Sequence, residues 1–291
     1  MIAVLTALEV EYAAVREHLT GLESRQHKEG TRFEVGVLAG HPHRTLALTC
    51  VGAGNVTAAA IAERVVAEFA PSALMSVGVA GALRDWVKLG DVVVATRVYA
   101  YEGGRTEGEE FLVRPRAWDL AHHVEQTART LTRSFAWRES LPDEPVAHLG
   151  PIAAGEVVHN SLTSDLARRL RTAYNDAIAV DMESAGLAHA GQLNGSMPVV
   201  TVRAVSDRAD GTKAQAHQAG WHPVAARNAA AFAVALAAAL DDRDSPDTPA
   251  EAAPPVIHNR NIAKDNARVG QQTGVVLGDF YTGHEPTGGR R

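Results

Sequence analysis

Residues 198–207 read PVVTVRAVSD, and this stretch decides how the chain folds. Apart from Thr201 and Arg203, the run is apolar and mostly valine until it reaches Ser206 and Asp207, which is typical of a strand buried on both faces. An arginine in such a strand needs a carboxylate partner, because an unpaired buried charge is costly. Strands of this kind belong to sheets that are covered by helices on both sides. The stretch therefore indicates an α/β fold.

Other strand patterns alternate with helix patterns along the chain up to residue 240. Strands are expected at 2–8, 32–38, 45–51, 73–79 and 91–101, with a brief apolar run at 178–180. Helices are expected at 10–19, 56–69, 162–174, 182–193 and 224–240. Pro71 should end the second helix, because a proline disfavours helical backbone in the residue before it. This alternation supports an α/β fold with helices on both faces of the sheet.

The composition excludes several classes of function. The chain has 291 residues, of which 46% are hydrophobic, so it can bury a sizeable core. A net charge of −6 argues against a nucleic-acid-binding protein, which usually carries a basic excess. The single cysteine, Cys50, rules out an internal disulfide and a cysteine-based zinc cluster. The N-terminus lacks the basic start of a signal peptide, and no apolar run is long enough to span a membrane, so we expect a cytoplasmic protein.

Two glycine-rich stretches follow strand patterns but carry little information alone. They read VGAGNV at 51–56 and VGVAGA at 77–82. Both place glycines where the backbone turns sharply or approaches a ligand. Neither completes the dinucleotide-binding fingerprint, so a plain tight turn is the simpler interpretation of each.

Acidic residues stand at three strand ends, and each set has a structural alternative. The Asp-Met-Glu sequence at 181–183 puts an apolar surface beside hydrogen-bond acceptors, which suits a sugar ring. Acids also favour the start of a helix, which explains the same residues. Asp207 can hold or donate a proton, or it can cap the following segment. Glu9 and Glu11 either lie at the same sheet edge or merely begin a helix.

Taken in order, these motifs resemble the nucleoside phosphorylase and nucleosidase superfamily, and within it the methylthioadenosine/S-adenosylhomocysteine nucleosidases. The resemblance runs from Met1 to about Leu240. It rests on ALEVE at 7–11, GAGN at 52–55, VGVAG at 77–81 with LGD at 89–91, AVDME at 179–183 and RAVSD at 203–207. It implies a single three-layer α/β/α domain over residues 1–240, with a mixed central sheet, that assembles as a homodimer. We expect no cofactor and no metal.

The resemblance also implies a role for each matching residue. Asp207 would be the general acid that protonates N7 of the leaving purine, and Glu11 would activate the attacking water. Met182 would lie against the ribose, and Glu183 would accept hydrogen bonds from its 2′- and 3′-hydroxyls. Such a pair of groups matches the charges that develop on the base and the sugar. The remaining candidates are Arg203 and Ser206, which would orient neighbouring carboxylates, and Ala7, Ala53, Val79, Gly81, Val158 and His159, which would line the substrate site.

Departures from the family pattern bear on the reaction and the substrate. Phosphorylases carry an arginine and a hydroxyl where this chain has Ser76 and Val79, so hydrolysis is favoured over phosphorolysis. Val158 stands where thioadenosine nucleosidases stack an aromatic side chain on the purine. Arg105, or the HPHR stretch at 41–44, could meet a 5′-phosphate or lie in a solvated loop. The substrate stays open among a thioadenosine, a plain nucleoside and a nucleotide.

The composition changes after residue 240. Residues 241–260 begin DDRDSPDTPAEAAPP, which predicts a disordered linker. In the tail at 261–291, the uncharged stretch 269–278 (VGQQTGVVLG) resembles bacterial amyloid-signalling motifs, in which glutamines form ladders and valines dry zippers. The alternative is an ordinary disordered tail. A signalling tail would make the protein an effector that a sensor with a like motif recruits.

Three functions therefore compete. The first is a purine nucleosidase that hydrolyses the N-glycosidic bond of an adenine nucleoside or nucleotide and acts as a conflict or immune effector. The second is a housekeeping methylthioadenosine/S-adenosylhomocysteine nucleosidase, or a phosphate-dependent nucleoside phosphorylase. The third is a scaffold without activity. Intact Glu11, Glu183 and Asp207 argue against the third, and the tail argues against the second, so the sequence favours the first.

Overall fold

The computed structural model describes residues 1–240. The elements are β1 (Ile2–Thr6), α1 (Glu9–Arg16), β2 (Leu19–Gln26), β3 (Arg32–Leu38), β4 (Thr45–Cys50), α2 (Asn55–Phe69), β5 (Ala73–Ala82), β6 (Val92–Ala100), β7 (Gly104–Glu107), β8 (Glu110–Val113), β9 (Arg116–Asp119), α3 (His122–Ser134), β10 (Ala147–Ala154), α4 (Asp165–Ala173), β11 (Ala179–Asp181), α5 (Ser184–Leu193), β12 (Val199–Asp207), α6 (Lys213–Gln218) and α7 (Trp221–Ala239). A short 3₁₀ turn, Ala136–Arg138, follows α3. None of these helices is both long and apolar enough to cross a membrane. The predicted linker (241–260) and tail (261–291) lie outside the described residues.

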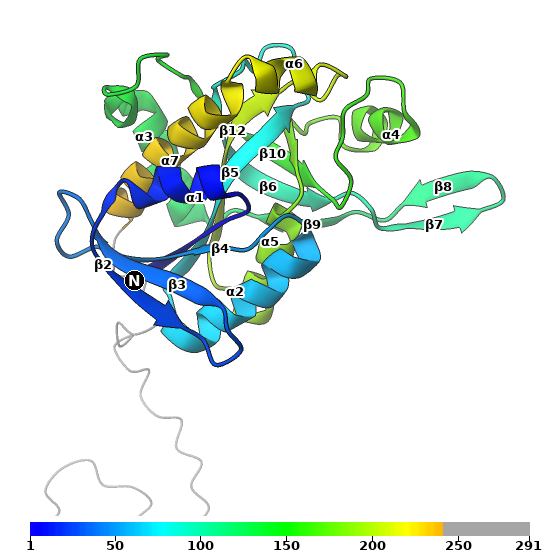
Figure 1. Ribbon diagram of the computed structural model, residues 1–291. Helices are drawn as coiled ribbons and strands as arrows, with labels where there is room; N and C mark the ends of the chain where they lie inside the picture. Colours follow the sequence, from blue (N-terminus) through cyan, green and yellow to red (C-terminus); the bar gives the residue numbers. More distant parts are fainter. Residues whose placement is uncertain (241–291) are drawn as a thin grey trace, which may run out of the picture. The chain divides into compact units, whose positions relative to one another are not determined.

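A mixed sheet of ten strands forms the middle layer (Figure 1). Its order is β11-β10-β6-β12-β5-β1-β4-β3-β2, with β9 paired to β6. Strands β5, β1 and β4 run parallel, as do β5 and β12, whereas β12 and β6 run antiparallel. Strand β11 pairs with β10 and also with β5, so β5, β12, β6, β10 and β11 close into a ring. The expected α/β fold with a mixed central sheet is confirmed.

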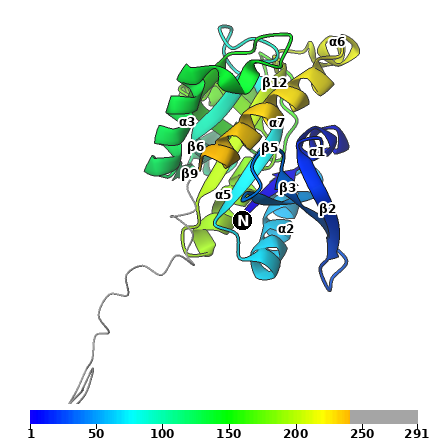
Figure 2. The same cartoon turned by 90° about the vertical axis from the view of Figure 1, so that its left-hand side faces the viewer.

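Helices cover both faces of this sheet (Figures 1 and 2). On one face α1, α3 and α7 pack into the core that includes Val15, Val124 and Phe232. On the other face α2 and α5 pack through small alanines and Leu187. The alanine-rich sequence of α7 lets that helix lie close to β12 and β5, and most of its residues after Arg227 are buried.

Most elements lie where the sequence patterns place them. Strand β3 has the predicted bounds. Helix α2 ends at Phe69 because Ala70 takes a left-handed backbone conformation directly before Pro71. Strand β10 was not predicted because Gly150 and Pro151 lie inside it, where its pairing with β6 shifts register. The other unpredicted elements are β2, β7, β8, β9, α3 and α6.

The register of the ring brings distant motifs together. Gly81 on β5 pairs with Asp207 at the end of β12 and with Val180 on β11. Ala7 directly follows β1, which is the other neighbour of β5. The ends of these strands therefore place the predicted site residues at one edge of the sheet, which is where ligands bind in open α/β folds.

Candidate active site

A cavity of about 360 Å³ opens at this edge. The predicted catalytic and substrate-binding residues all line it: Ala7, Glu11, Ala53, Val79, Gly81, Val158, His159, Met182, Glu183, Ser206 and Asp207. Arg203 does not line the cavity and is only 1% exposed. Three basic side chains that belong to none of the sequence motifs also line it: Lys213 and His217 on α6, and His222 on α7.

The Glu11 carboxylate is held by backbone donors from two parts of the fold. Its Oε2 accepts the N–H groups of Ala7 at 2.8 Å and Leu8 at 3.0 Å, and its Oε1 accepts the N–H of Val79 at 2.8 Å. Glu11 is 2% exposed, although it belongs to the first turn of α1. Three fixed donors give this carboxylate one orientation in the cavity, as a general base requires.

Gly78 makes room for this arrangement. A Cβ built at Gly78 would collide with Oε1 of Glu11 and with Nη1 of Arg203. The glycine-rich stretch at 77–82 is therefore more than a tight turn, because its backbone lies against two charged side chains. Sequence alone does not show this, since the contacts come from α1 and β12.

Arg203 connects the buried acids below the cavity. Its Nε donates to Asp181 Oδ2 at 2.7 Å, and its Nη2 donates to Glu183 Oε2 at 3.2 Å and to Ser76 Oγ at 2.9 Å. The arginine of the deciding strand thus has two carboxylate partners, which offset the cost of burying its charge. Ser76, at the position where phosphorylases carry arginine, is used by this network.

Glu183 stands between Arg203 and the cavity. Its Oε1 accepts the N–H of Gly54 at 3.2 Å, so the first glycine-rich stretch also contributes to the site. Burial raises the pKa of its carboxyl to about 7, while the charge of Arg203 opposes this rise. Met182 lies beside it on the cavity wall. A carboxyl group next to an apolar side chain suits a ribose, because the carboxyl can accept hydrogen bonds from the hydroxyls and the apolar side chain can pack against the ring.

Asp207 lies at the end of β12 and is 3% exposed. Its Oδ1 accepts the N–H of Ala209 at 3.0 Å, and its Oδ2 accepts the hydroxyl of Ser206 at 3.2 Å. Lys213 Nζ approaches the same Oδ2 at 3.4 Å. The pairing of Ser206 with Asp207 that the resemblance implies is present, whereas the lysine was missed because its position depends on how α6 folds back over β12.

The wall near Asp207 is formed by the loop after β10. Val158 is 56% exposed, and no Phe, Tyr or Trp of residues 1–240 lines the cavity. His159 beside it is buried, and burial, assisted by the charge of Arg171, lowers its pKa. Of the residues weighed for a phosphate, Arg105 lies on β7 and pairs with Glu107. Neither Arg105 nor the 41–44 stretch lines the cavity.

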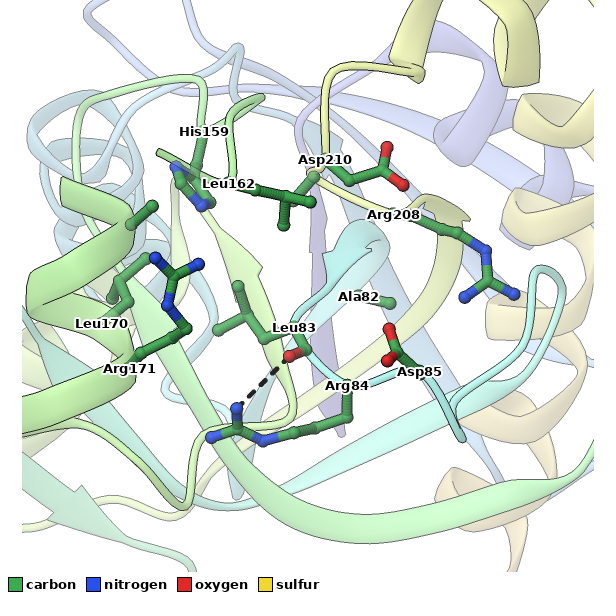
Figure 3. A pocket seen from close by; sticks show the side chains of 12 residues that line it. Ala82, Leu83, Arg84, Asp85, His159, Leu162, Leu170, Arg171, Arg208 and Asp210 are labelled. Atoms are coloured by element: carbon green, nitrogen blue, oxygen red, sulfur yellow. Dashed lines mark hydrogen bonds between the residues drawn. The ribbon is translucent and has the colours of Figure 1, made fainter. Parts of the chain in front are cut away.

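A second cavity, of about 350 Å³, adjoins the first and shares His159 with it (Figure 3). Its charged lining residues are Arg84, Arg171, Arg208, Asp85 and Asp210. It contains none of the three acids expected to act on substrate. Within residues 1–240, no group of three His, Cys, Asp or Glu side chains is placed to hold a metal ion.

Known proteins resemble this chain over its described part. The model of the phosphorylase superfamily matches residues 1–241. An ATP nucleosidase, Cap17, from Escherichia coli (strain KTE188) is 28% identical over 253 residues, covering 79% of this chain and 49% of that protein. The chain thus spans about half the length of this relative. A 5′-methylthioadenosine/S-adenosylhomocysteine nucleosidase from Staphylococcus carnosus (strain TM300) is 27% identical, covering 72% of this chain and 88% of that one.

A solved structure shows the same fold. The 5′-methylthioadenosine/S-adenosylhomocysteine nucleosidase from Neisseria meningitidis, in complex with methylthio-immucillin-A, superposes with a TM-score of 0.69 at 25% identity. The match covers 82% of this chain and 99% of the other.

Proposed function

The chain belongs to the phosphorylase superfamily, and from this membership and its site we propose that it is a purine nucleosidase. It hydrolyses the N-glycosidic bond of an adenine nucleoside or nucleotide. One observation carries the proposal: Glu11, Glu183 and Asp207, from three distant parts of the sequence, line one cavity, and the fold buries and holds each of them.

The roles follow from the charges that the reaction develops. Breaking the bond between sugar and base leaves positive charge on the sugar and negative charge on the base. Asp207 delivers a proton to N7 of the purine. Glu11, held by three backbone N–H groups, orients and deprotonates the attacking water and stabilises the cationic sugar. Glu183 accepts hydrogen bonds from the ribose hydroxyls.

Two groups at the positions where phosphorylases bind phosphate are already hydrogen-bonded within the protein, and this supports hydrolysis over phosphorolysis. The backbone N–H of Val79 is bound to Glu11, and the hydroxyl of Ser76 is bound to Arg203. A phosphate next to the Glu11 carboxylate would meet a like charge instead of a cation.

A second candidate is the salvage of methylthioadenosine or S-adenosylhomocysteine. The relative from Staphylococcus carnosus supports it, because this chain covers 88% of that enzyme. The effector role and the sensor partner depend on the tail, and they stay predictions, as does the homodimer.

Product analysis tests the proposal. The full chain is incubated with adenosine, methylthioadenosine, AMP and ATP, each with and without inorganic phosphate, and products are separated by chromatography. We expect free adenine and a free sugar product at rates independent of phosphate. Asp207→Asn is the matched control for contaminating enzymes. Dominant formation of a sugar 1-phosphate would show phosphorolysis, and no adenine from any substrate would overturn the nucleosidase proposal.

A further inference from the structure

The segment from α6 to the start of α7 brings a cluster of basic side chains to the active-site cavity. Lys213, His217 and His222 all line it, and the two imidazole rings lie 5.5 Å apart. Within residues 1–240, neither imidazole has a hydrogen bond or an ion pair in the structure. His217 is exposed and His222 is half-buried, so both can reach a ligand that fills the cavity.

These groups are the polar part of the lining that the proposed chemistry leaves unused. Asp207 and His159 stand where the base is protonated, and Glu183 where the ribose hydroxyls bind. Glu11 activates the attacking water. The part of a nucleoside that still lacks a partner is its 5′ substituent. A neutral thioether there would cover nitrogen donors without bonding to them, which costs free energy, whereas a phosphate accepts from all three.

The charges around the cavity point the same way. Besides Lys213 and the histidines, its ionisable lining consists of the carboxyls of Glu11, Asp181, Glu183 and Asp207. An anionic substituent would be repelled next to these acids. Within the described residues, the α6–α7 segment is where the lining gathers an ammonium and two imidazoles. The other imidazole of the lining, His159, lies on the wall near Asp207.

We propose that Lys213, His217 and His222 form a subsite for the 5′-phosphate of the substrate, so that the substrates of this site are purine nucleotides instead of thioethers. This inference rests on the proposed nucleosidase function and names its substrate class. Lys213 joins the subsite to the reacting end, because its Nζ also lies 3.4 Å from Asp207.

The arginine-lined cavity is the alternative place for a phosphate, and it lies outside the cavity that Glu11, Glu183 and Asp207 line. Figure 3 shows Arg171 beside His159, with Arg84 below it in this view. The two cavities share only His159, which belongs to the wall near Asp207. A phosphate bound among those arginines would therefore lie beyond His159, in a cavity that contains none of Glu11, Glu183 and Asp207. Arg171, whose side chain has no hydrogen bond or ion pair with any residue in 1–240, supplies a matched control cation.

The experiment compares kcat/KM for AMP and ATP with kcat/KM for adenosine and methylthioadenosine. The proteins are the full chain, a His217→Gln/His222→Gln double variant and Arg171→Met. We expect the wild type to prefer nucleotides at least about tenfold. The double variant should lose at least about tenfold in its AMP-to-adenosine ratio, which corresponds to one lost charge-assisted contact, and Arg171→Met should keep the ratio within about twofold. Lys213 is left intact because its change would also disturb Asp207.

The outcomes separate the two proposals. If adenosine or methylthioadenosine is cleaved as fast as AMP, or if the double variant keeps the nucleotide preference, the subsite is wrong while the nucleosidase function stands. A ratio that falls in Arg171→Met assigns the phosphate to the arginine-lined cavity and overturns the inference. If the double variant cleaves nothing, calorimetric titration with AMP and adenosine decides: unchanged AMP affinity refutes the subsite. If the wild type cleaves none of the substrates, the proposed function fails.

Discussion

Arg203→Met should strongly destabilise the fold, because it leaves two buried carboxylates without their cation. Arg203 is 1% exposed and donates to Asp181 at 2.7 Å and to Glu183 at 3.2 Å. Removing one partner of a buried ion pair costs about 3–5 kcal/mol, out of a total stability of about 5–15 kcal/mol for a typical domain. For a domain of this size the melting temperature should fall by roughly 6–20 °C.

The stability lost in Arg203→Met should depend on pH, and the Glu183 carboxyl determines the direction of this dependence. Burial raises its folded-state pKa to about 7, above the value of about 4.3 for an unfolded chain. Its contribution to stability is therefore complete below the unfolded pKa and is lost as the pH rises through 7. Since the charge of Arg203 lowers this pKa, the variant raises it further. The difference in free energy of unfolding between the wild type and Arg203→Met should therefore be larger at about pH 8 than at about pH 5.5.

Urea denaturation followed by circular dichroism at both pH values measures this effect. Arg97→Met is the matched control, because the Arg97–Asp119 pair is exposed and such pairs contribute only about 0–1 kcal/mol. A deficit for Arg203→Met as small as that of the control, or equal at the two pH values, would refute the reasoning.

Three further predictions concern catalysis and the tail. Gly78→Ala should lower kcat/KM about 100-fold, because its Cβ would displace the Glu11 carboxyl; an active, folded variant would show that Glu11 need not be held there. Asp207→Asn should lower the rate of adenine release by about 10²–10⁴-fold with unchanged circular dichroism, and wild-type turnover would disprove its role as general acid. From the sequence, residues 1–240 alone should stay soluble and keep basal activity, while a 256–291 peptide should form dye-binding fibrils that Val275→Lys blocks. A peptide that stays monomeric under seeding would remove the main support for the effector role.

The sequence predicts the elements whose pattern is local and continuous, and most of those it misses are interrupted or short. Helix α3 is the exception, since Val124 and Ala128 stand at helical spacing on its buried face. Strand β3 alternates and has the predicted bounds, and β12 is a continuous apolar run. In contrast, Pro151 in the middle of β10 argues against a strand, and the structure accommodates it only through a register shift next to Gly150. Helix α6 has only six residues, too few for a helical period to stand out.

The same distinction applies to the site. Acids at the ends of apolar strands are visible in the sequence, and Glu11, Glu183 and Asp207 line the cavity accordingly. What holds them is not visible, because it comes from register and from backbone. The N–H of Val79 reaches Glu11 only because β5 lies next to β1, and Lys213 reaches Asp207 only because α6 turns back. Contacts of this kind depend on tertiary placement and have no local pattern.

One buried network connects the stability of the fold with the proposed choice of reaction. The hydroxyl of Ser76 accepts a hydrogen bond from Arg203, and Ser76 is itself 1% exposed. An arginine at position 76, as phosphorylases have, would remove the hydroxyl that accepts from Arg203 and would put a much larger side chain in a fully packed place. Overpacking of this kind typically costs about 1–3 kcal/mol. A phosphate-binding arginine would therefore disturb the network that holds Glu183 in this chain, so the packing beneath the cavity favours water as the nucleophile.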